Sequence, residues 1–157
     1  MKQKLNDSTR FSKLEASPFF ANFTKTEIKE LAKDSTAFEN FVAGSYICAE
    51  GDLEQALFII LSGEAHVVKR TPNGQTGIVK LKTSSIVGEL SLLRKGKRVS
   101  DIKALKETMV YKLTPEQIKA KNIQLQVKIK SQILNLVIRR YENLCEKYSE
   151  LLNLHST

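Results

Sequence analysis

The spacing of apolar residues between Phe38 and Tyr111 is typical of short strands. β-branched and aromatic runs alternate there with turn residues, and such a series favours an antiparallel sandwich or jelly roll over a parallel sheet. Asn73-Gly74 is a good pair for the tight turn of a hairpin between two of the runs. The runs that predict strands are Leu57–Leu61, Ala65–Val68, Ile78–Leu81 and Met109–Leu113.

Helix-start signals stand on both sides of this region. Thr24-Lys25-Thr26-Glu27 is a capping box followed by apolar residues at helical spacing, and Thr114-Pro115-Glu116-Gln117 is a second one. Helical periodicity then continues almost to the end, which predicts a long helix over 123–152, roughly 45 Å in length. Residues 1–16 are polar and predict a tail or a short helix.

These elements together predict an α+β protein. We expect an antiparallel β-roll, or jelly roll, flanked by N-terminal helices and by a long C-terminal helix. The expected parts are an N-terminal tail or short helix over 1–16, the β-roll domain over 17–122 and the C-terminal helix over 123–157.

The long helix carries more apolar surface than one packing face requires. Seven of its residues follow an a/d heptad repeat, which Lys130 interrupts once. One stripe can pack on the chain's own sheet while the other meets the same helix of a second copy, so we expect a homodimer. Docking of a single broad face within the chain is the alternative. The heptad residues are Val127, Leu134, Val137, Tyr141, Leu144, Tyr148 and Leu151, and the wider apolar surface adds Ile129, Ile133, Leu136, Ile138, Cys145 and Leu152.

Composition indicates one compact domain. The chain has 157 residues, 41% of them hydrophobic, and a chain of this length buries about 70% of its unfolded surface. No apolar run follows the basic Met1-Lys2-Gln3-Lys4, and no segment reaches the ~20 apolar residues of a membrane span. Cys48 and Cys145 lack metal-ligand spacing and are expected to be buried, reduced thiols. We therefore expect a cytoplasmic protein.

The formal net charge of +8 raises the question of nucleic-acid binding. Basic residues are spread along the chain, with a local concentration at Arg94-Lys95, Lys97-Arg98 and Lys103. An anionic small ligand accounts for part of that concentration, and solvated lysines account for the rest. No helix-turn-helix pattern stands between the strand-rich region and Thr157, so we expect no DNA-recognition helix.

The segment that suggests chemistry is Gly88-Glu89-Leu90-Ser91-Leu92-Leu93, followed ten residues after the glycine by Arg98. A glycine turn lets backbone approach a ligand closely, and the start of a helix offers free N–H groups to an anion. Arg98 adds a guanidinium fork suited to phosphate. Glu89 would repel an anion, but its presence makes sense if the ligand also carries hydroxyl donors such as those of a ribose. The pattern favours a nucleotide pocket.

These residues resemble the phosphate-binding cassette of cyclic nucleotide-binding domains, the family of the catabolite activator protein and the protein kinase A regulatory subunits. That cassette runs Gly-Glu, then small and aliphatic residues, a short loop, and Arg before small residues, as Gly88–Leu93 and Arg98–Ser100 do here. Three further segments resemble family motifs in the same order, so the likeness covers roughly residues 17–145. They are Pro18–Phe23, Gly44–Asp52 and Leu57–Glu64.

The resemblance implies a role for each cassette residue. Arg98 would bind the cyclic phosphate and Glu89 would accept a hydrogen bond from the ribose 2′-hydroxyl. The residues that would bring backbone close to the ligand are Gly88, Leu90, Ser91, Val99 and Ser100. Asp101 would alternate away from the pocket if its strand is regular.

The resemblance also bears on the base. Family members usually carry alanine, serine or threonine where Val99 stands, and threonine there is associated with guanine recognition. Valine has no hydroxyl, so we expect cAMP rather than cGMP as the ligand, with cGMP as the alternative. The base-capping residue of the family comes from the long C-terminal helix, and Asn143 lies at a suitable distance along it, with Arg139 and Arg140 one turn earlier.

The implied function is a cyclic nucleotide sensor that has no cofactor and signals through its C-terminal helix to another protein. Three alternatives stay open: a retained fold whose altered pocket serves as a protein-interaction module, a DNA-binding regulator that uses basic surface, and an enzyme. His66 and His155 cannot assemble a three-ligand metal site, and no nucleophile–histidine arrangement is visible, so we expect neither catalytic nor metal-binding residues. A cyclic dinucleotide is least favoured, because the cassette has charge for a single phosphate.

Overall fold

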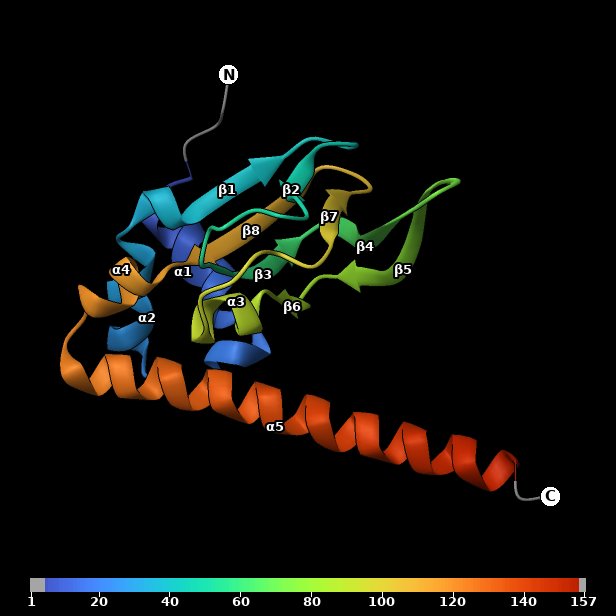
Figure 1. Cartoon of the computed structure of the whole chain (residues 1–157). Helices are drawn as coiled ribbons and strands as arrows, with labels where there is room; N and C mark the ends of the chain where they lie inside the picture. The colour runs from blue at the N-terminus through green and yellow to red at the C-terminus, as the bar shows by residue number, and fades with distance from the viewer. Residues whose placement is uncertain (1–4, 156–157) are drawn as a thin grey trace. The chain divides into compact units, whose positions relative to one another are not determined.

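A computed structural model describes residues 5–155 of the chain (Figure 1). The chain divides into two compact units, Met1–Ala120 and Lys121–Thr157. The first unit contains every strand and all the shorter helices, and the second consists of one long helix. The predicted architecture, an antiparallel β-roll with N-terminal helices and a long C-terminal helix, is confirmed.

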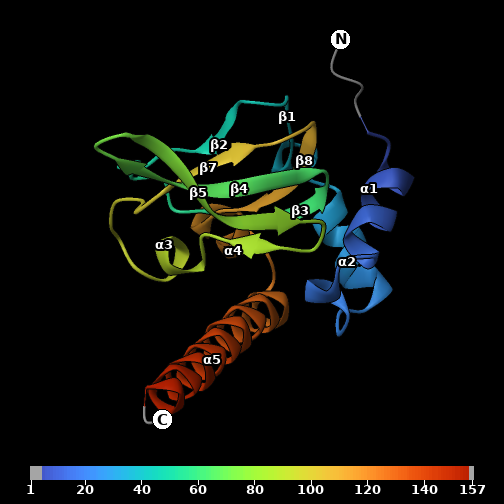
Figure 2. The same ribbon diagram turned by 90° about the vertical axis from the view of Figure 1, so that its right-hand side faces the viewer.

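The N-terminal helices gather beyond one end of the strands (Figure 2). They are α1 (Asp7–Glu15), the 3₁₀ helix η1 (Pro18–Phe20), α2 (Lys25–Ala32) and η2 (Ser35–Ala37). The capping box predicted before α2 is present: the Thr24 side chain accepts from the Glu27 N–H, and the Glu27 carboxylate accepts from the Thr24 N–H. Helix α1 lies within residues 1–16, the segment predicted to be a tail or a short helix.

Within residues 5–155, eight strands form two four-stranded antiparallel sheets, one with strand order β1-β8-β3-β6 and the other β2-β7-β4-β5. Figure 2 shows the second sheet as one layer in front of the first. The strands are β1 (Phe38–Phe41), β2 (Tyr46–Cys48), β3 (Leu57–Ser62), β4 (Glu64–Thr71), β5 (Gly74–Lys82), β6 (Ile86–Val87), β7 (Asp101–Ala104) and β8 (Thr108–Leu113).

Apolar side chains from both sheets form the core of the roll. Phe58 and Ile60 of β3 and Val110 of β8 pack with Ala65 of β4 and Ile102 of β7 in one buried cluster. This burial of alternating inward residues is what a half-apolar strand pattern requires.

Tyr111 of β8 fastens the N-terminal helices to the first sheet. Its buried ring contacts Phe20 and Phe38 edge to face, and its hydroxyl donates to the Leu31 carbonyl of α2. Burial raises the pKa of this phenol above its ordinary value, so the group stays neutral and remains a hydrogen-bond donor.

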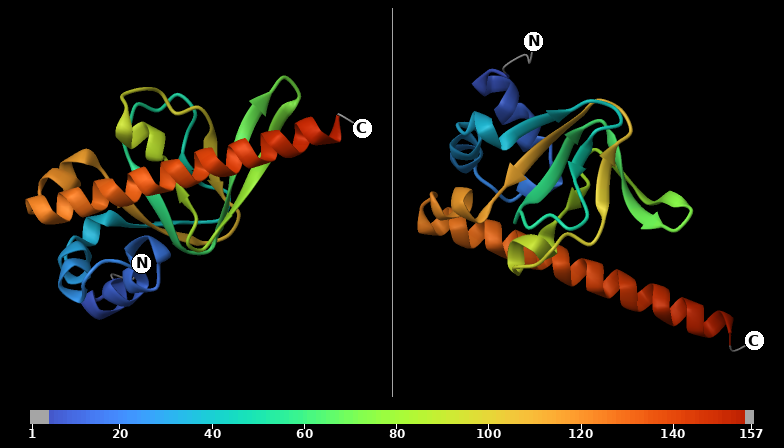
Figure 3. Two further views of the ribbon diagram at one scale, coloured as in Figure 1. Left: turned by 90° about the horizontal axis from the view of Figure 1, so that it is seen from below. Right: turned by 45° about the horizontal axis from the view of Figure 1, so that its top comes forward.

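The hairpin turn between β4 and β5 lies one residue earlier than predicted. Thr71 pairs with Gly74, so the turn residues are Pro72 and Asn73, and Gly74 begins β5 with φ +119°. Proline at the second and glycine at the fourth position of a four-residue turn suit a type I turn, and this preference outweighs the Asn-Gly signal. The tip of the hairpin projects beyond the other strands in Figure 1 and in the right-hand view of Figure 3.

Two short helices and one long helix complete the chain. They are α3 (Glu89–Leu93), α4 (Pro115–Lys119) and α5 (Ile123–Leu154). The second predicted capping box begins α4, where Thr114 and Gln117 exchange hydrogen bonds. Asn122 caps α5 by accepting from the Leu125 N–H. The predicted helix start near Asn122 is confirmed.

The second unit, α5, is one continuous helix of 32 residues (Figure 3). Buried side chains occur only in its first half among its described residues, at Leu125, Ile129, Ile133 and Leu136. Most of the predicted heptad residues are exposed, namely Val127, Leu134, Tyr141, Leu144, Tyr148 and Leu151. The wider apolar set therefore divides into a buried row and an exposed one.

One cysteine differs from its predicted environment. Cys48 is buried in the roll, and burial raises the pKa of its thiol. Cys145 is exposed, so the expectation of two buried thiols is wrong for it, because it lies in the half of α5 whose side chains are all solvent-exposed.

The core cluster predicts a large difference between two identical substitutions. Ile60 is 1% exposed, whereas Ile78 of β5 is 57% exposed. We expect Ile60→Ala to lower the free energy of unfolding by about 2–5 kcal/mol, because the removed atoms leave a cavity. Ile78→Ala is the matched control and should change it by less than about 0.5 kcal/mol. Urea unfolding followed by circular dichroism measures both, and equal midpoints would contradict this account of the core.

Candidate functional site

Gly88 turns the chain from β6 into α3 and could not be another residue without strain. Its φ of +91° lies in the left-handed region, where an L side chain is unfavourable. A Cβ at this position would collide with the Ala56 carbonyl and with the Arg98 guanidinium. The glycine is therefore needed for two reasons, its backbone angle and the close approach of its neighbours.

The Ala56 carbonyl is the point at which this turn, α3 and Arg98 meet. It accepts a hydrogen bond from Arg98 Nη2 at 2.8 Å and lies 3.2 Å from the Ser91 hydroxyl. The same hydroxyl lies 2.8 Å from the Gly88 carbonyl. Residues 88, 91 and 98, which the sequence analysis chose from their spacing, are thus brought together around one backbone oxygen.

Arg98 is 7% exposed, which is unusual for an arginine. Its guanidinium lies over the Phe58 ring, with Cζ 5.3 Å from the ring centroid. Its buried Nε has no hydrogen-bond partner among the described residues. A buried N–H donor without an acceptor is costly, and it is the arrangement expected of a donor that serves a ligand.

The backbone of Arg98 is held by the 49–52 loop (residues 49–52, between β2 and β3). The Arg98 N–H donates to the Asp52 carbonyl at 2.8 Å, and the Gly51 N–H donates to the Arg98 carbonyl at 2.8 Å. Two reciprocal bonds of this kind fix both the position and the direction of the residue. The loop lies within Gly44–Asp52, one of the segments that resemble motifs of the cyclic nucleotide-binding domains.

The other cassette residues differ in exposure. Glu89 is buried at the start of α3, whereas Leu90 and Val99 are exposed and Ser100 is half-buried. At the start of α3 the Leu92 N–H donates to the Gly88 carbonyl. The amides of Leu90 and Ser91 precede this bond, in the first turn, where the backbone N–H groups of a helix have no carbonyl four residues earlier in the same helix.

Asn143 lies on the exposed second half of α5, in the second unit. Arg139 and Arg140, the alternatives one turn earlier, are exposed on the same helix. The base-capping role of all three stays a prediction.

Asp101, the residue that begins β7, lies in an environment that the sequence does not predict. The side chain is completely buried, and its pKa is held below the ordinary range chiefly by hydrogen bonds from Arg70 of β4. An isolated Asp in a strand pattern is a signal that a cationic partner is required. The sequence does not say that the partner stands 31 residues earlier.

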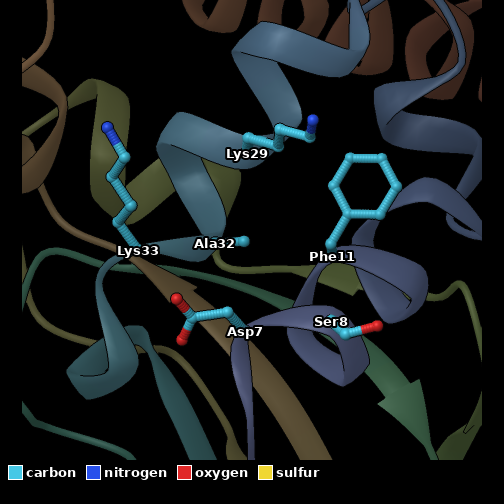
Figure 4. Close-up of a pocket in the computed structure, with 6 residues that line it drawn as sticks. All are labelled: Asp7, Ser8, Phe11, Lys29, Ala32 and Lys33. Carbon is cyan, nitrogen blue, oxygen red and sulfur yellow. The ribbon is translucent and has the colours of Figure 1, made fainter.

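A pocket of about 410 Å³ lies between α1 and α2 and does not include the cassette (Figure 4). Its lining includes Asp7 and Phe11 from α1 and Lys29 and Lys33 from the end of α2. Asp7 pairs with Arg10, and Lys33 pairs with Glu30, so two of its charged groups are already engaged within the N-terminal helices.

Within residues 5–155, no group of three or more His, Cys, Asp or Glu side chains is arranged to hold a metal ion. Of the helices that the structure describes, none combines the length and the apolar character needed to cross a membrane.

The sequence matches a family model and several curated proteins. The family model of the cyclic nucleotide-binding domain matches residues 38–121. A CRP-like cAMP-activated global transcriptional regulator of Mycobacterium tuberculosis is 25% identical over 114 residues, which cover 72% of this chain and 50% of the regulator. The chain spans half or less of the length of the first curated relatives that it matches.

Solved structures share the fold. The catabolite activator protein of Thermus thermophilus has a TM-score of 0.71 at 25% identity over 86% of this chain and 63% of that one. A cyclic nucleotide-binding domain from Methylobacillus flagellatus has a TM-score of 0.71 at 24% identity, over 93% of this chain and 84% of that one.

The Gly88 turn predicts a stability difference between two glycines of the same segment. We expect Gly88→Ala to lower the free energy of unfolding by about 1–3 kcal/mol, since the backbone would be strained and the new methyl would collide with Ala56 and Arg98. Gly96→Ala is the control, because nothing lies within 4 Å of its added Cβ, and a change below about 0.5 kcal/mol is expected there. Chemical denaturation measures the free energy of unfolding of both variants. An unchanged value for Gly88→Ala would contradict the packing described.

Proposed function

The chain belongs to the cyclic nucleotide-binding domain family, and from that premise we propose that it binds a cyclic purine nucleotide and passes the signal to a partner protein through its C-terminal helix. The observation that carries the proposal is the buried guanidinium of Arg98 beside the Gly88 turn, with an Nε–H that no described acceptor satisfies. A guanidinium fork in this position suits a single phosphate, which it can bind with two parallel hydrogen bonds.

Glu89 supplies the sugar end of the proposed site. Its buried carboxylate follows directly after Gly88 and is proposed to accept a hydrogen bond from the ribose 2′-hydroxyl. Such a bond accounts for an acidic residue beside a phosphate site, because the carboxylate then faces a donor rather than the anion. The backbone amides of Leu90, Ser91 and Val99 are proposed to face the phosphate, with Ser100 completing the cassette.

Val99 favours cAMP as the ligand over cGMP. The residue is 66% exposed, and its side chain offers no hydroxyl to a guanine. Asn143 of α5 is proposed to cap the base. We propose no cofactor beyond the nucleotide, no catalytic activity, and a cytoplasmic location for the protein.

Signalling requires that the nucleotide bind one arrangement of the chain more tightly than another. We propose α5 as the element that responds, because its buried row lies in the first half of the helix and the second half is free for a partner. A ligand with equal affinity for both arrangements would bind without signalling.

The exposed row of α5 is proposed to form a homodimer. Tyr141, Leu144, Tyr148 and Leu151 are each more than half exposed and recur at heptad spacing. A continuous exposed apolar stripe of this kind is a mark of an interface, and a parallel or antiparallel copy of the same helix fits it.

A second function is favoured by the exposed valine in the cassette, where the family has smaller or hydroxylated residues. In that case the fold is kept, the pocket is altered, and the chain acts as a protein-interaction or dimerisation module. The two functions differ in whether any cyclic nucleotide binds.

Calorimetric titration of nucleotide-stripped protein with cAMP and cGMP tests the binding proposal. We expect cAMP to bind more tightly than cGMP and Arg98→Ala to lose about 2–5 kcal/mol of binding free energy, roughly thirtyfold or more in Kd. Arg94→Ala, at an exposed arginine four residues earlier, is the control and should leave the Kd unchanged. No heat with either nucleotide in folded wild-type protein would favour the interaction module.

The dimer proposal is tested by sedimentation analysis of the full chain. Leu144→Glu places a charge in the exposed heptad row and should raise the dimer dissociation constant by at least about tenfold, or ~1.4 kcal/mol. Ser149→Glu adds the same charge to an exposed position outside the row and serves as the control. A monomeric wild-type protein, or equal effects of the two variants, would contradict a dimer through this row.

A further inference from the structure

The carboxylate of Asp101 uses all of its hydrogen-bonding capacity while being 0% exposed. One oxygen, Oδ1, accepts from the Glu50 N–H at 2.7 Å and from Arg70 Nη2 at 3.1 Å. The other, Oδ2, accepts from Arg70 Nε at 3.0 Å and from Gln75 Nε2 at 3.1 Å. A carboxylate has about four acceptor positions, and here each is filled by a donor from a different group or atom.

Strand register explains why these residues meet. Asp101 of β7 lies opposite Val68 of β4, so Arg70, two residues further along β4, projects from the same face. Gln75 of β5 lies opposite Arg70. Gln75 Nε2 also donates to the Tyr46 hydroxyl of β2 at 3.0 Å, so one polar network reaches all four strands of the second sheet.

The network continues to Arg98 through the 49–52 loop. Asp101 holds the loop at the Glu50 N–H, and the next two residues of the loop, Gly51 and Asp52, make the two bonds that frame the Arg98 backbone. Asp101 also stands three residues after Arg98 along the chain. Asp101 is therefore connected to the cassette arginine both through the loop and along the chain.

We propose that Asp101 is the positioning residue of the phosphate site: it fixes the 49–52 loop, and through it Arg98, and it clamps the β4–β5 hairpin to the strand that leaves the cassette. This inference rests on the proposed function for its link to nucleotide affinity, but not for the clamp itself. The clamp couples the β4–β5 hairpin to the cassette, so that a displacement of one also displaces the other.

Global stability is not the main contribution of the ion pair. The Arg70 side chain is 57% exposed, so solvent screens its attraction to the buried Asp101 carboxylate and limits what that attraction adds to the free energy of unfolding. What the bidentate geometry fixes is position, since two parallel bonds to a planar guanidinium allow one orientation. A positioning role therefore predicts effects on local opening and on affinity that exceed the effect on overall stability.

Amide hydrogen exchange of the ligand-free protein tests the clamp. Asp101→Asn keeps one acceptor oxygen for the Glu50 N–H but sets an N–H₂ against the donors of Arg70 and Gln75, so amides of residues 69–77 should exchange faster while Gly51 and Arg98 stay protected. Asp101→Ala removes both oxygens and should speed exchange at Gly51 and Arg98 as well, by about tenfold, the order expected of groups in one network.

Glu64→Gln is the matched control. Glu64, like Asp101, is a carboxylate with cationic partners, in this case Lys80 and Lys106. It stands at the start of β4, at the other end of that strand from Arg70. It should change none of these amides. If Asp101→Ala fails to fold, Arg70→Gln carries the test, because it removes the exposed partner and leaves the buried carboxylate bonded to Glu50 and Gln75.

Affinity for cAMP is the second measurement, made on the same folded variants. We expect Asp101→Ala and Arg70→Gln each to raise the Kd, and the double variant to bind no more weakly than Asp101→Ala alone, because the two residues act through one contact. Unchanged exchange at residues 49–52 and 69–77 would overturn the clamp, and unchanged Kd in a folded Asp101→Ala protein would overturn the positioning role. If the wild-type protein binds no nucleotide, the proposed function is contradicted but the clamp is not, because the hydrogen-exchange data test the clamp independently.

Discussion

Burying an arginine is the physical constraint on which the cassette depends. A guanidinium withdrawn from water needs acceptors and a fixed position, and Arg98 obtains the first from the Ala56 carbonyl and the second from the 49–52 loop. Gly88 must then lack a side chain, because the guanidinium occupies the space that a Cβ would take. Ser91 shares the same carbonyl, so α3 is tied to the arginine as well. The position of the Arg98 side chain thus accounts for the glycine at Gly88 and for the contact of Ser91 with the Ala56 carbonyl.

The β-roll provides the rigid frame that this burial requires. Phe58, over which Arg98 lies, belongs to the core cluster, so the floor of the site is continuous with the packed interior. Asp101 connects the same region to the second sheet. Strands and a loop that are fixed in this way can present hydrogen-bond donors to a ligand without much rearrangement. Such preorganisation lowers the free-energy cost of ordering the site on binding.

Local signals were enough to predict much of the fold. Both capping boxes, the start of α5 and the strand-rich middle depend on residues within a few positions of each other, and each was found where the sequence placed it. The cassette is similarly local, since Arg98 stands ten positions after Gly88, and the family assignment made from it is confirmed by the family model. The ligand roles assigned to individual residues stay predictions.

What the sequence could not supply depends on distant partners or on a choice between local signals. Asp101 meets Arg70 only because two strands adopt one register, which no spacing rule specifies. The β4–β5 turn carries two competing signals, and the proline decided between them. The surroundings of Cys145 depend on which part of a long helix is covered, and a helical repeat gives the faces of a helix but not the length over which each is buried. That exposed thiol has a practical consequence. With Cys48 enclosed in the roll, the natural sequence offers Cys145 as a single attachment point for a spin label on α5, and the continuous-wave electron resonance line shape of that label reports the mobility of the helix in solution without an engineered cysteine.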